Sequence, residues 1–281
     1  MQNLIDRYSV YDVLNRQNPR PLVKILVSYV KPSFLFKTDI LTPIHLGRAV
    51  EREASKDGIV PEEGIRWLHE HCIGDDGLEG NISSVNRRVG FLTGTYWAWK
   101  NYDKLGDPEY FGSFGYRRIL DPVFLEDLSA YDIILPYKRK FNLETIREQF
   151  LSYHGRDLYD RMIEVFDRVY PQEKSLFVRY LQATSGYFDE LYVAKKDVFF
   201  DFCRWIFPLV FEYLKYPPVK HLADKRDVGF IAERLTGYYC DKVSGSLHVR
   251  EVGICLTQKP RVNRALLNRE LLLKLKGRMQ K

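Results

Sequence analysis

The sequence PLVKILVSYV, residues 21–30, decides the fold class. It is a short, apolar, β-rich run that ends at Lys31-Pro32, which is typical of a strand buried on both faces of a parallel sheet. Segments with helical and strand-like patterns alternate after it. We therefore expect an α/β fold in which helices flank a mostly parallel central sheet.

The remaining pattern predicts the elements of such a fold. Strands are expected at 109–120, 131–136, 190–196 and 246–257, and helices at 43–55, 85–106, 142–170, 197–216 and 227–243. Residues 1–20 form a helical or extended arm, residues 21–258 the main domain, and residues 259–281 a basic helix. No internal repeat or interdomain linker interrupts this order.

Composition and cysteine spacing narrow the class of protein. Hydrophobic residues make up 45% and charged residues 28% of the 281 residues, which is ordinary for a globular protein. The aromatic content of 14% suits a deep core or a cleft with stacking platforms, and composition alone favours the core. The four cysteines form no C-x-x-C pair, so a zinc ribbon or a thioredoxin-like site is not expected.

The N-terminal stretch and the hydropathy pattern bear on location. Charges interrupt residues 1–21, so we expect no signal peptide. No apolar run approaches the ~18 residues that a membrane-spanning helix needs. A cytoplasmic protein with reduced thiols is the expectation.

Positive charge is concentrated at the C-terminus. The net charge is +6, and residues 259–281 carry eight cations and one anion, so the rest of the chain is close to neutral. Six leucines in this segment give a helix with an apolar face and a basic face, which suits an anionic membrane surface. The candidate membrane contacts are Arg264, Arg269, Lys274 and Lys276. Docking of this helix on its own domain is an equal alternative, and nucleic-acid binding is not predicted.

Several common catalytic motifs are absent from the sequence. It contains no G-x-G-x-x-G after the first strand, no G-x-x-x-x-G-K-[ST], no G-x-S-x-G and no H-E-x-x-H. His69 and His71 are two residues apart, and this spacing does not make a metal site. We interpret them as ordinary surface or core histidines, and no metal ligand is predicted.

Polar residues gather where strands are expected to end. The loop after residue 73 carries Asp75 and Asp76, expected to be exposed, and Asn81, while the strand at 109–115 leads to Arg117 and Arg118. Open α/β sheets bind ligands at the carboxyl ends of their strands. Paired arginines there match a diphosphate, because each guanidinium offers a planar fork of donors. A structural salt bridge is the equal alternative for either arginine.

A series of motifs resembles a known family. They are LVSYVKP, PIHLGRAV, GDDGLEGNIS, TGTYWAWKNY, FGSFGYRRIL, YDIILP and VGFIAERL, and they extend over about residues 22–255. In this order they resemble a bacterial glycosyltransferase family of capsular-polysaccharide and O-antigen clusters, many of whose members are described only as a domain of unknown function. The resemblance implies a GT-A-like, nucleotide-sugar-dependent catalytic domain at 21–258.

The resemblance also frames the donor site. In GT-A enzymes a central strand usually ends in Asp-x-Asp, which holds a divalent metal against the donor diphosphate. Here the similar strand ends in Tyr116-Arg117-Arg118, and two cations could replace that metal. No cofactor is firmly predicted; Asp75, Asp76 and Asp132 leave room for Mg²⁺ or Mn²⁺, which we do not expect to be essential. Tyr116 is a candidate to stack on the donor, whereas Trp97 and Trp99 are expected to pack in the core.

An inverting transfer of this kind needs a general base for the acceptor hydroxyl. Asp189, Glu190 and Glu233 are the candidates. An ion pair with Arg234 that braces the helix is an equal interpretation of Glu233.

The chain departs from the family pattern in three places. Gly115 stands where a histidine is usual, Gly90-Phe91 where a Cys-Glu pair is usual, and Asp189-Glu190 where an Asn-Met pair is usual. These changes bear on the donor sugar, on the linkage and on the need for a metal.

The predicted function is transfer of a hexose from a nucleotide-diphosphate sugar, UDP-sugar first, to a bacterial surface glycan of the capsule, O-antigen or lipopolysaccharide. The predicted partners are the donor, a glycan or glycolipid acceptor and, through the C-terminal segment, the inner face of the inner membrane. Two rivals stay open. One is a non-catalytic membrane-surface scaffold with a degenerate glycosyltransferase fold, which Gly115 and Phe91 favour, and the other is a nucleotidyltransferase.

Overall fold

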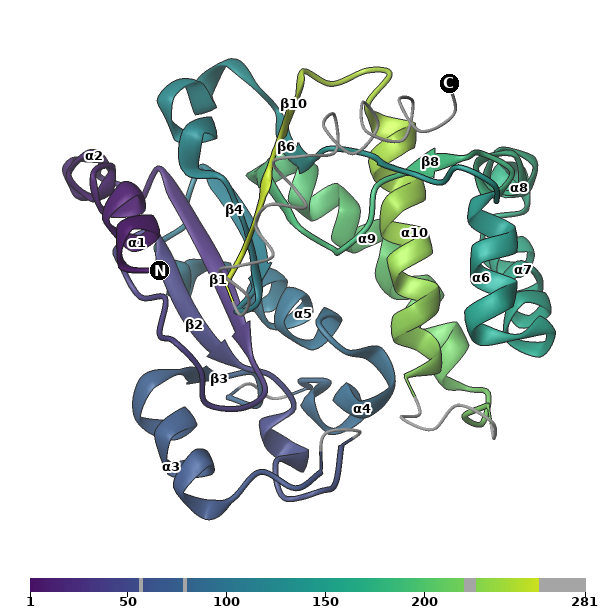
Figure 1. Cartoon of the computed structure of the whole chain (residues 1–281), viewed down its shortest axis with the longest axis horizontal. Coiled ribbons are helices and arrows are strands. Elements are labelled where there is room, and N and C mark those ends of the chain that lie inside the picture. Colours follow the sequence, from purple (N-terminus) through teal and green to yellow (C-terminus); the bar gives the residue numbers. More distant parts are fainter. Residues whose placement is uncertain (56–57, 78–79, 220–225, 258–281) are drawn as a thin grey trace, which may run out of the picture.

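The computed structural model describes residues 1–55, 58–77, 80–219 and 226–257, and Figure 1 shows their arrangement around one central sheet. The sheet has the order β10-β6-β9-β4-β1-β2-β3, with β5 joining β4 to β11. Its strands are β1 (Val23–Tyr29), β2 (Leu41–His45), β3 (Ile73–Gly74), β4 (Tyr110–Gly115), β5 (Arg118–Leu120), β6 (Ile133–Pro136), β9 (Tyr192–Lys195), β10 (Val249–Val252) and β11 (Ile254–Leu256). A separate pair is formed by β7 (Arg139–Lys140) and β8 (Ser185–Gly186).

Strand direction decides which ends meet at the site. β4, β1, β2 and β3 run parallel, and β6 and β10 run parallel to each other. β9 is antiparallel to both β4 and β6. The carboxyl end of β4 and the amino end of β9 therefore lie at the same edge of the sheet. The mostly parallel sheet and its flanking helices confirm the predicted α/β class.

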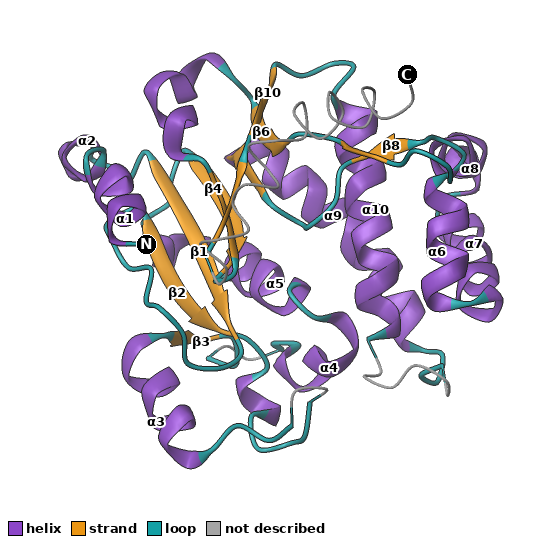
Figure 2. Cartoon of the chain, in the orientation of Figure 1, coloured by secondary structure: helices purple, strands orange, loops and turns teal. Residues whose placement is uncertain are grey.

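Figure 2 shows the helices around this sheet. They are α1 (Gln2–Ser9), α2 (Asp12–Gln17), α3 (Glu62–His71), α4 (Asn86–Val89), α5 (Leu92–Lys100), α6 (Ile146–His154), α7 (Arg156–Val169), α8 (Lys174–Leu181), α9 (Lys196–Leu214) and α10 (Asp227–Val243). Short 3₁₀ turns are η1 (Arg48–Val50), η2 (Ser83–Val85), η3 (Tyr102–Leu105), η4 (Pro122–Ala130) and η5 (Pro171–Glu173). No helix in these described ranges has the length and apolar character to cross a membrane.

The central strand β1 is buried on both faces, as its apolar run predicts. Leu26 packs into one hydrophobic cluster, whereas Ile25 and Val27 pack into the other. Successive side chains of a strand point to opposite faces, so one continuous apolar sequence can fill two cores. The second of these cores also buries Tyr8 of α1, whose hydroxyl donates to the Leu120 carbonyl at 2.7 Å. The expected N-terminal arm is thus helical and packed.

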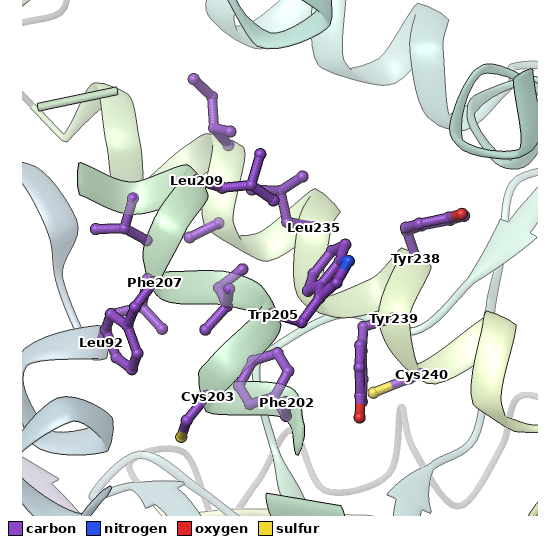
Figure 3. Close-up of a cluster of buried hydrophobic side chains, with 14 of the residues drawn as sticks. Leu92, Phe202, Cys203, Trp205, Phe207, Leu209, Leu235, Tyr238, Tyr239 and Cys240 are labelled. Atoms are coloured by element: carbon purple, nitrogen blue, oxygen red, sulfur yellow. The ribbon is translucent and has the colours of Figure 1, made fainter. Parts of the chain in front are cut away.

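The first core extends into a helical layer. Figure 1 shows α6, α7 and α8 on the outer side of α9 and α10, away from the sheet. In Figure 3, Trp205 of α9 lies beside Tyr239 of α10, and their ring centroids are 5.3 Å apart. Burying such large rings supplies most of the stabilising apolar contact between these helices. This layer fixes α10, which contributes to the site.

The predicted elements agree with the structure in type more often than in extent. The helix at 227–243 is confirmed, and the strands at 21–30, 131–136 and 190–196 are confirmed with slightly narrower bounds. The helix predicted at 43–55 is wrong, because that segment contains the end of β2 and then η1. Gly47 between them has φ +70°, which a helix does not allow. The helix at 85–106 is broken where Gly90 has φ +63°, and residues 259–281 lie outside the described residues.

Candidate active site

A cavity of about 290 Å³ opens at the carboxyl ends of β1 and β4. Its walls come from the β4–β5 turn, the loop before β9, the α4–α5 junction and the first half of α10. Six of the residues proposed from sequence line it: Tyr116, Arg117, Arg118, Asp189, Glu190 and Glu233. Ligands bind at this edge in open α/β sheets, so the cavity is the candidate active site.

The β4–β5 turn holds the two arginines at the rim. The Tyr116 N–H donates to the Ser28 carbonyl of β1 at 3.1 Å, and the Thr257 N–H donates to the Arg117 carbonyl at 3.0 Å. The backbone is therefore fixed on both sides of the turn, while the Arg118 side chain stays 48% exposed. Fixed backbone and solvent-facing guanidinium groups suit the binding of an anion.

Asp189 ties two arginines together. Its carboxylate lies 3.2 Å from Nη1 of Arg118 and 2.9 Å from Nη2 of Arg139. Arg139 comes from β7, and its guanidinium also packs 4.9 Å from the Phe188 ring centroid. The sequence reasoning missed Arg139, because nothing in its local pattern shows that the β7–β8 pairing brings it to this loop. One carboxylate between two arginines leaves excess positive charge at the rim.

The loop before β9 has an unusual backbone. Asp189 and Glu190 are consecutive and have φ angles of 73° and 55°. This left-handed region is costly for side chains with a Cβ, by roughly 1–3 kcal/mol for each residue. The Asp189 N–H donates to Oε1 of Glu233 at 3.3 Å, which helps to hold the turn. Strained backbone of this kind often marks positions where function dictates geometry.

Glu190 is the carboxyl group without a partner. Its Oε1 is buried and has no hydrogen-bond partner within the described part of the chain. Burial raises its pKa well above the ordinary value, and the neighbouring Glu233 charge raises the pKa further. The protonated form of Glu190 is therefore favoured more strongly than that of an exposed glutamate.

Glu233 has the opposite character. Burial acts to raise its pKa, but the Arg234 charge and hydrogen bond outweigh burial and leave the pKa lowered. Arg234 is only 1% exposed, lies between the rings of Phe150 and Phe188, and also donates to Gln149. The ion pair proposed from sequence is therefore present. Two neighbouring carboxyl groups with pKa values pushed apart are typical of acid–base sites.

Three of the predicted donor ligands lie outside the cavity. Asp75 was expected to be exposed and is only 1% exposed. It accepts from the Gly47 N–H at 2.7 Å, the Arg48 N–H at 3.1 Å and the Ser83 hydroxyl at 2.5 Å. Asn81 donates to the Asp76 carbonyl at 3.0 Å. These groups organise the loops beyond β2 and β3, and the expectation that Asp75 is exposed is wrong.

Asp132 is also not where it was expected. It precedes β6, which runs in the same direction as β4, and therefore lies at the opposite edge of the sheet. Its carboxylate is 2.7 Å from Nζ of Lys195 and 2.8 Å from the His248 N–H. The Lys195 hydrogen bond lowers its pKa. Sequence order suggested proximity that the strand directions do not allow.

The aromatic candidates are packed rather than open. Tyr116 lines the cavity with only 4% exposure, and its ring stacks on Tyr29 with centroids 5.3 Å apart. Trp97 is buried, and Trp99 stacks on Phe207. The expectation that both tryptophans pack in the core is confirmed.

The three departures from the family pattern converge. Gly115, Gly90-Phe91 and Asp189-Glu190 all line this one cavity, although they are far apart in sequence. Substitutions that gather at one site change what that site binds more readily than substitutions scattered over a surface.

The residues at the rim do not fit a divalent metal held against a diphosphate. β4 ends in arginines where acidic ligands would be needed, and Asp189 is already neutralised by Arg118 and Arg139. Hard divalent ions need several carboxylate or carbonyl oxygens. We derive no step through such an ion.

The comparisons with known proteins agree with this architecture. A solved structure described as the apo form of WbbM, a bifunctional glycosyltransferase, matches with a TM-score of 0.67 and 25% sequence identity. The match covers 84% of this chain and 45% of that one, so this chain spans less than half of that protein. No curated protein matches. The family model named "Domain of unknown function (DUF4422)" matches residues 24–244, which is most of the sequence, and the chain therefore belongs to the DUF4422 family.

Proposed function

We propose that this protein is a glycosyltransferase that uses a nucleotide-diphosphate sugar. The observation that carries the proposal is the cavity in which excess arginine charge stands beside two carboxyl groups, Glu190 and Glu233, whose pKa values are shifted in opposite directions. The arginines suit a diphosphate leaving group, and the carboxyl groups suit proton transfer from an acceptor. The similarity to a glycosyltransferase fold supports the same reaction class.

Arg117 and Arg118 bind the donor diphosphate in this proposal. Charge builds up on the leaving nucleotide as the glycosidic bond breaks, and preorganised cations stabilise that charge. Asp189 acts as a positioning residue, because it holds Arg118 and Arg139 through one carboxylate.

Glu190 is the general base that we propose among the three candidates. Asp189 is held by two arginines and Glu233 by Arg234, whereas Glu190 has a buried oxygen that no described donor reaches. Glu190 must first lose its own proton, and its raised pKa then makes the ionised form a stronger base for the acceptor hydroxyl. Glu233 contributes by keeping a negative charge next to Glu190.

The proposal extends to a UDP-hexose donor and a surface-glycan acceptor of capsule, O-antigen or lipopolysaccharide. This finer assignment follows the family resemblance in the sequence. The three departures in the cavity are expected to determine which sugar is accepted.

We also propose peripheral attachment at the inner face of the inner membrane. Residues Arg264, Arg269, Lys274 and Lys276 belong to the basic segment outside the described residues. The described residues end at Thr257, whose N–H donates to the Arg117 carbonyl at the cavity rim. Truncation after Gln258 should abolish co-sedimentation with anionic liposomes at low salt. Equal liposome binding with and without the segment would contradict attachment through it.

A thermal-shift screen with UDP, GDP, their hexose conjugates and UTP tests the reaction class. A transferase should be stabilised most by a nucleoside diphosphate or its sugar. A scaffold should show no shift, and a nucleotidyltransferase should prefer the triphosphate. Arg118→Ala should remove the shift, whereas Arg156→Ala, at an exposed ion pair on α7, should keep it.

Metal dependence is a separate part of the proposal. Turnover should need neither Mg²⁺ nor Mn²⁺, because the arginines carry the charge that the metal would otherwise supply. Activity lost on EDTA treatment and restored by Mn²⁺, but not by Zn²⁺, would contradict it.

A further inference from the structure

Three potential metal ligands converge beside the active-site cavity. They are His45 at the end of β2, Glu51 after η1 and His69 on α3. The ligand atoms all lie within 4.8 Å of one another. Oε2 of Glu51 is 3.7 Å from Nδ1 of His45 and 2.8 Å from Nε2 of His69. Across the described ranges, this is the one such group of three or more.

His45 supplies an independent sign of a missing ligand. The residue is only 2% exposed, and its Nδ1 has no hydrogen-bond partner in the part of the chain that the structure describes. A buried polar nitrogen without a partner costs free energy, and this one faces the Glu51 carboxylate.

We propose that His45, Glu51 and His69 bind one divalent transition-metal ion of the zinc class. Two imidazole nitrogens and one carboxylate oxygen form a donor set that zinc accepts in tetrahedral sites. A cavity of about 40 Å³ is lined by His45 and Glu51, which is room for a water molecule as fourth ligand. The proposal does not depend on glycosyl transfer.

Arg48 contacts one ring nitrogen of His69, so the His69 proton and the Arg48 side chain must both move when the ion binds. Its Nη2 lies 3.1 Å from Nδ1 of His69, and arginine can only donate, so this Nδ1 accepts. The His69 proton is then on Nε2 and is donated to Glu51. Metal binding at Nε2 moves this proton to Nδ1 through solvent, with no net release. Arg48 must turn away, and the Asp76 carboxylate 3.9 Å from its Nε can receive it.

The site would join the segment after β2 to helix α3. The small cavity that His45 and Glu51 line shares Val30, Leu46 and Arg226 with the active-site cavity. A bound ion would therefore brace one wall of the active site without touching the arginine rim.

The test measures metal binding by the full chain after removal of bound ions with a chelator and dialysis. Calorimetric titration with ZnCl₂ should show one ion per chain, with a dissociation constant on the order of micromolar or tighter. His69→Ala should weaken binding by roughly 100-fold or more, because even outer-shell losses cost about 10–100-fold. Glu51→Gln should weaken it by at least about 10-fold. Co²⁺ should give visible bands of nitrogen and oxygen ligation.

His71→Ala is the matched control. His71 lies on the same helix, but its ring stacks on Trp67 and its Nδ1 is 2.8 Å from the Trp67 carbonyl, outside the cluster. This variant should bind zinc as the unchanged protein does. Arg48→Met should bind zinc about 10-fold more tightly, because it removes the competing cation and donor.

Three results would overturn the proposal. The first is no zinc binding up to about 100 µM, because protein zinc sites bind far more tightly than that. The second is equal zinc binding by His69→Ala and the unchanged protein. The third is thiolate charge-transfer bands with Co²⁺, which would place the ion at cysteines. If His69→Ala fails to fold, the zinc affinities of Glu51→Gln and Arg48→Met decide whether the site exists. Misfolding cannot raise the affinity for zinc, so an affinity of Arg48→Met that is no higher than that of the unchanged protein would count against the site.

Discussion

The two edges of the central sheet carry similar charges in different arrangements. At the amino end of β4, Asp132 pairs with Lys195 and Asp107 pairs with Lys196, so acids and bases are matched. At the carboxyl end, Arg118 and Arg139 share Asp189, and Arg117 has no carboxylate partner among the described residues. Matched charges have their partners already, whereas excess cations beside a glutamate with a raised pKa are arranged for a ligand.

The largest expected effect is on the rate of glycosyl transfer when Glu190 is replaced. Glu190→Gln should lower the rate of glycosyl transfer by about 10²–10⁴-fold, because the amide cannot accept the acceptor proton. Turnover of a UDP-sugar onto a short soluble acceptor measures it. A variant that folds and keeps its normal rate would move the base to Asp189 or Glu233.

The second effect concerns the arginine rim. Arg117→Ala or Arg118→Ala should cost ~2–4 kcal/mol of transition-state stabilisation, which is on the order of 10²–10³ in rate. Steady-state kinetics, with Arg156→Ala as control, checks this. If both rim variants turn over normally, the diphosphate does not bind here.

We expect Glu190 and Asp132, at the two edges of the sheet, to change the stability of the fold with pH in opposite directions. The raised pKa of Glu190 means that the fold binds this proton more tightly than the unfolded chain does. Stability should therefore fall as pH rises from about 4.5, the ordinary glutamate value, towards the raised pKa. The lowered pKa of Asp132 has the opposite sign, since its stabilisation is present above its ordinary value and is lost as pH falls.

Melting temperatures measured from below pH 3.8, the ordinary aspartate value, to above pH 4.5 test the contrast. Relative to the unchanged protein, Glu190→Gln should gain stability as pH rises above 4.5, and Asp132→Asn should lose stability as pH rises towards 3.8 and should change little above it. Parallel curves for the two variants would show that the edges do not differ in this respect.

The smallest expected effect is on the rate of glycosyl transfer when Asp132, at the amino end of β4, is replaced. Asp132→Asn should leave turnover unchanged and lower stability by no more than about 1 kcal/mol, as partly exposed ion pairs contribute little. A large drop in turnover would mean that the opposite edge also takes part in the reaction.

Local pattern predicted much of the fold and part of the site. The helix at 227–243 could be predicted because its apolar face repeats over several turns, and β1 because its short run is mostly apolar and rich in β-branched residues. The segment after β2 could not, because Gly47 ends the strand in a left-handed turn.

The site residues show the same limit. Arg117 and Arg118 were predicted from their position at the end of a predicted strand, and both line the cavity. Asp75 was misjudged because its donors, Gly47 and Arg48, are distant in sequence. Arg139 was missed because only the pairing of β7 with β8 brings it to Asp189. Position at a strand end is local information, whereas the partner of a charge is tertiary information.

The hydrogen bonds that hold the β4–β5 turn on both sides have a consequence for biosynthesis. β5 pairs on one side with β4 and on the other with β11, where Leu256 lies opposite Arg118. A nascent chain therefore exposes β5 as an open edge until residues 254–256 have left the ribosome. The arginine rim is therefore complete only after residues 254–256 have been synthesised, so translation products that end before them should not bind the donor.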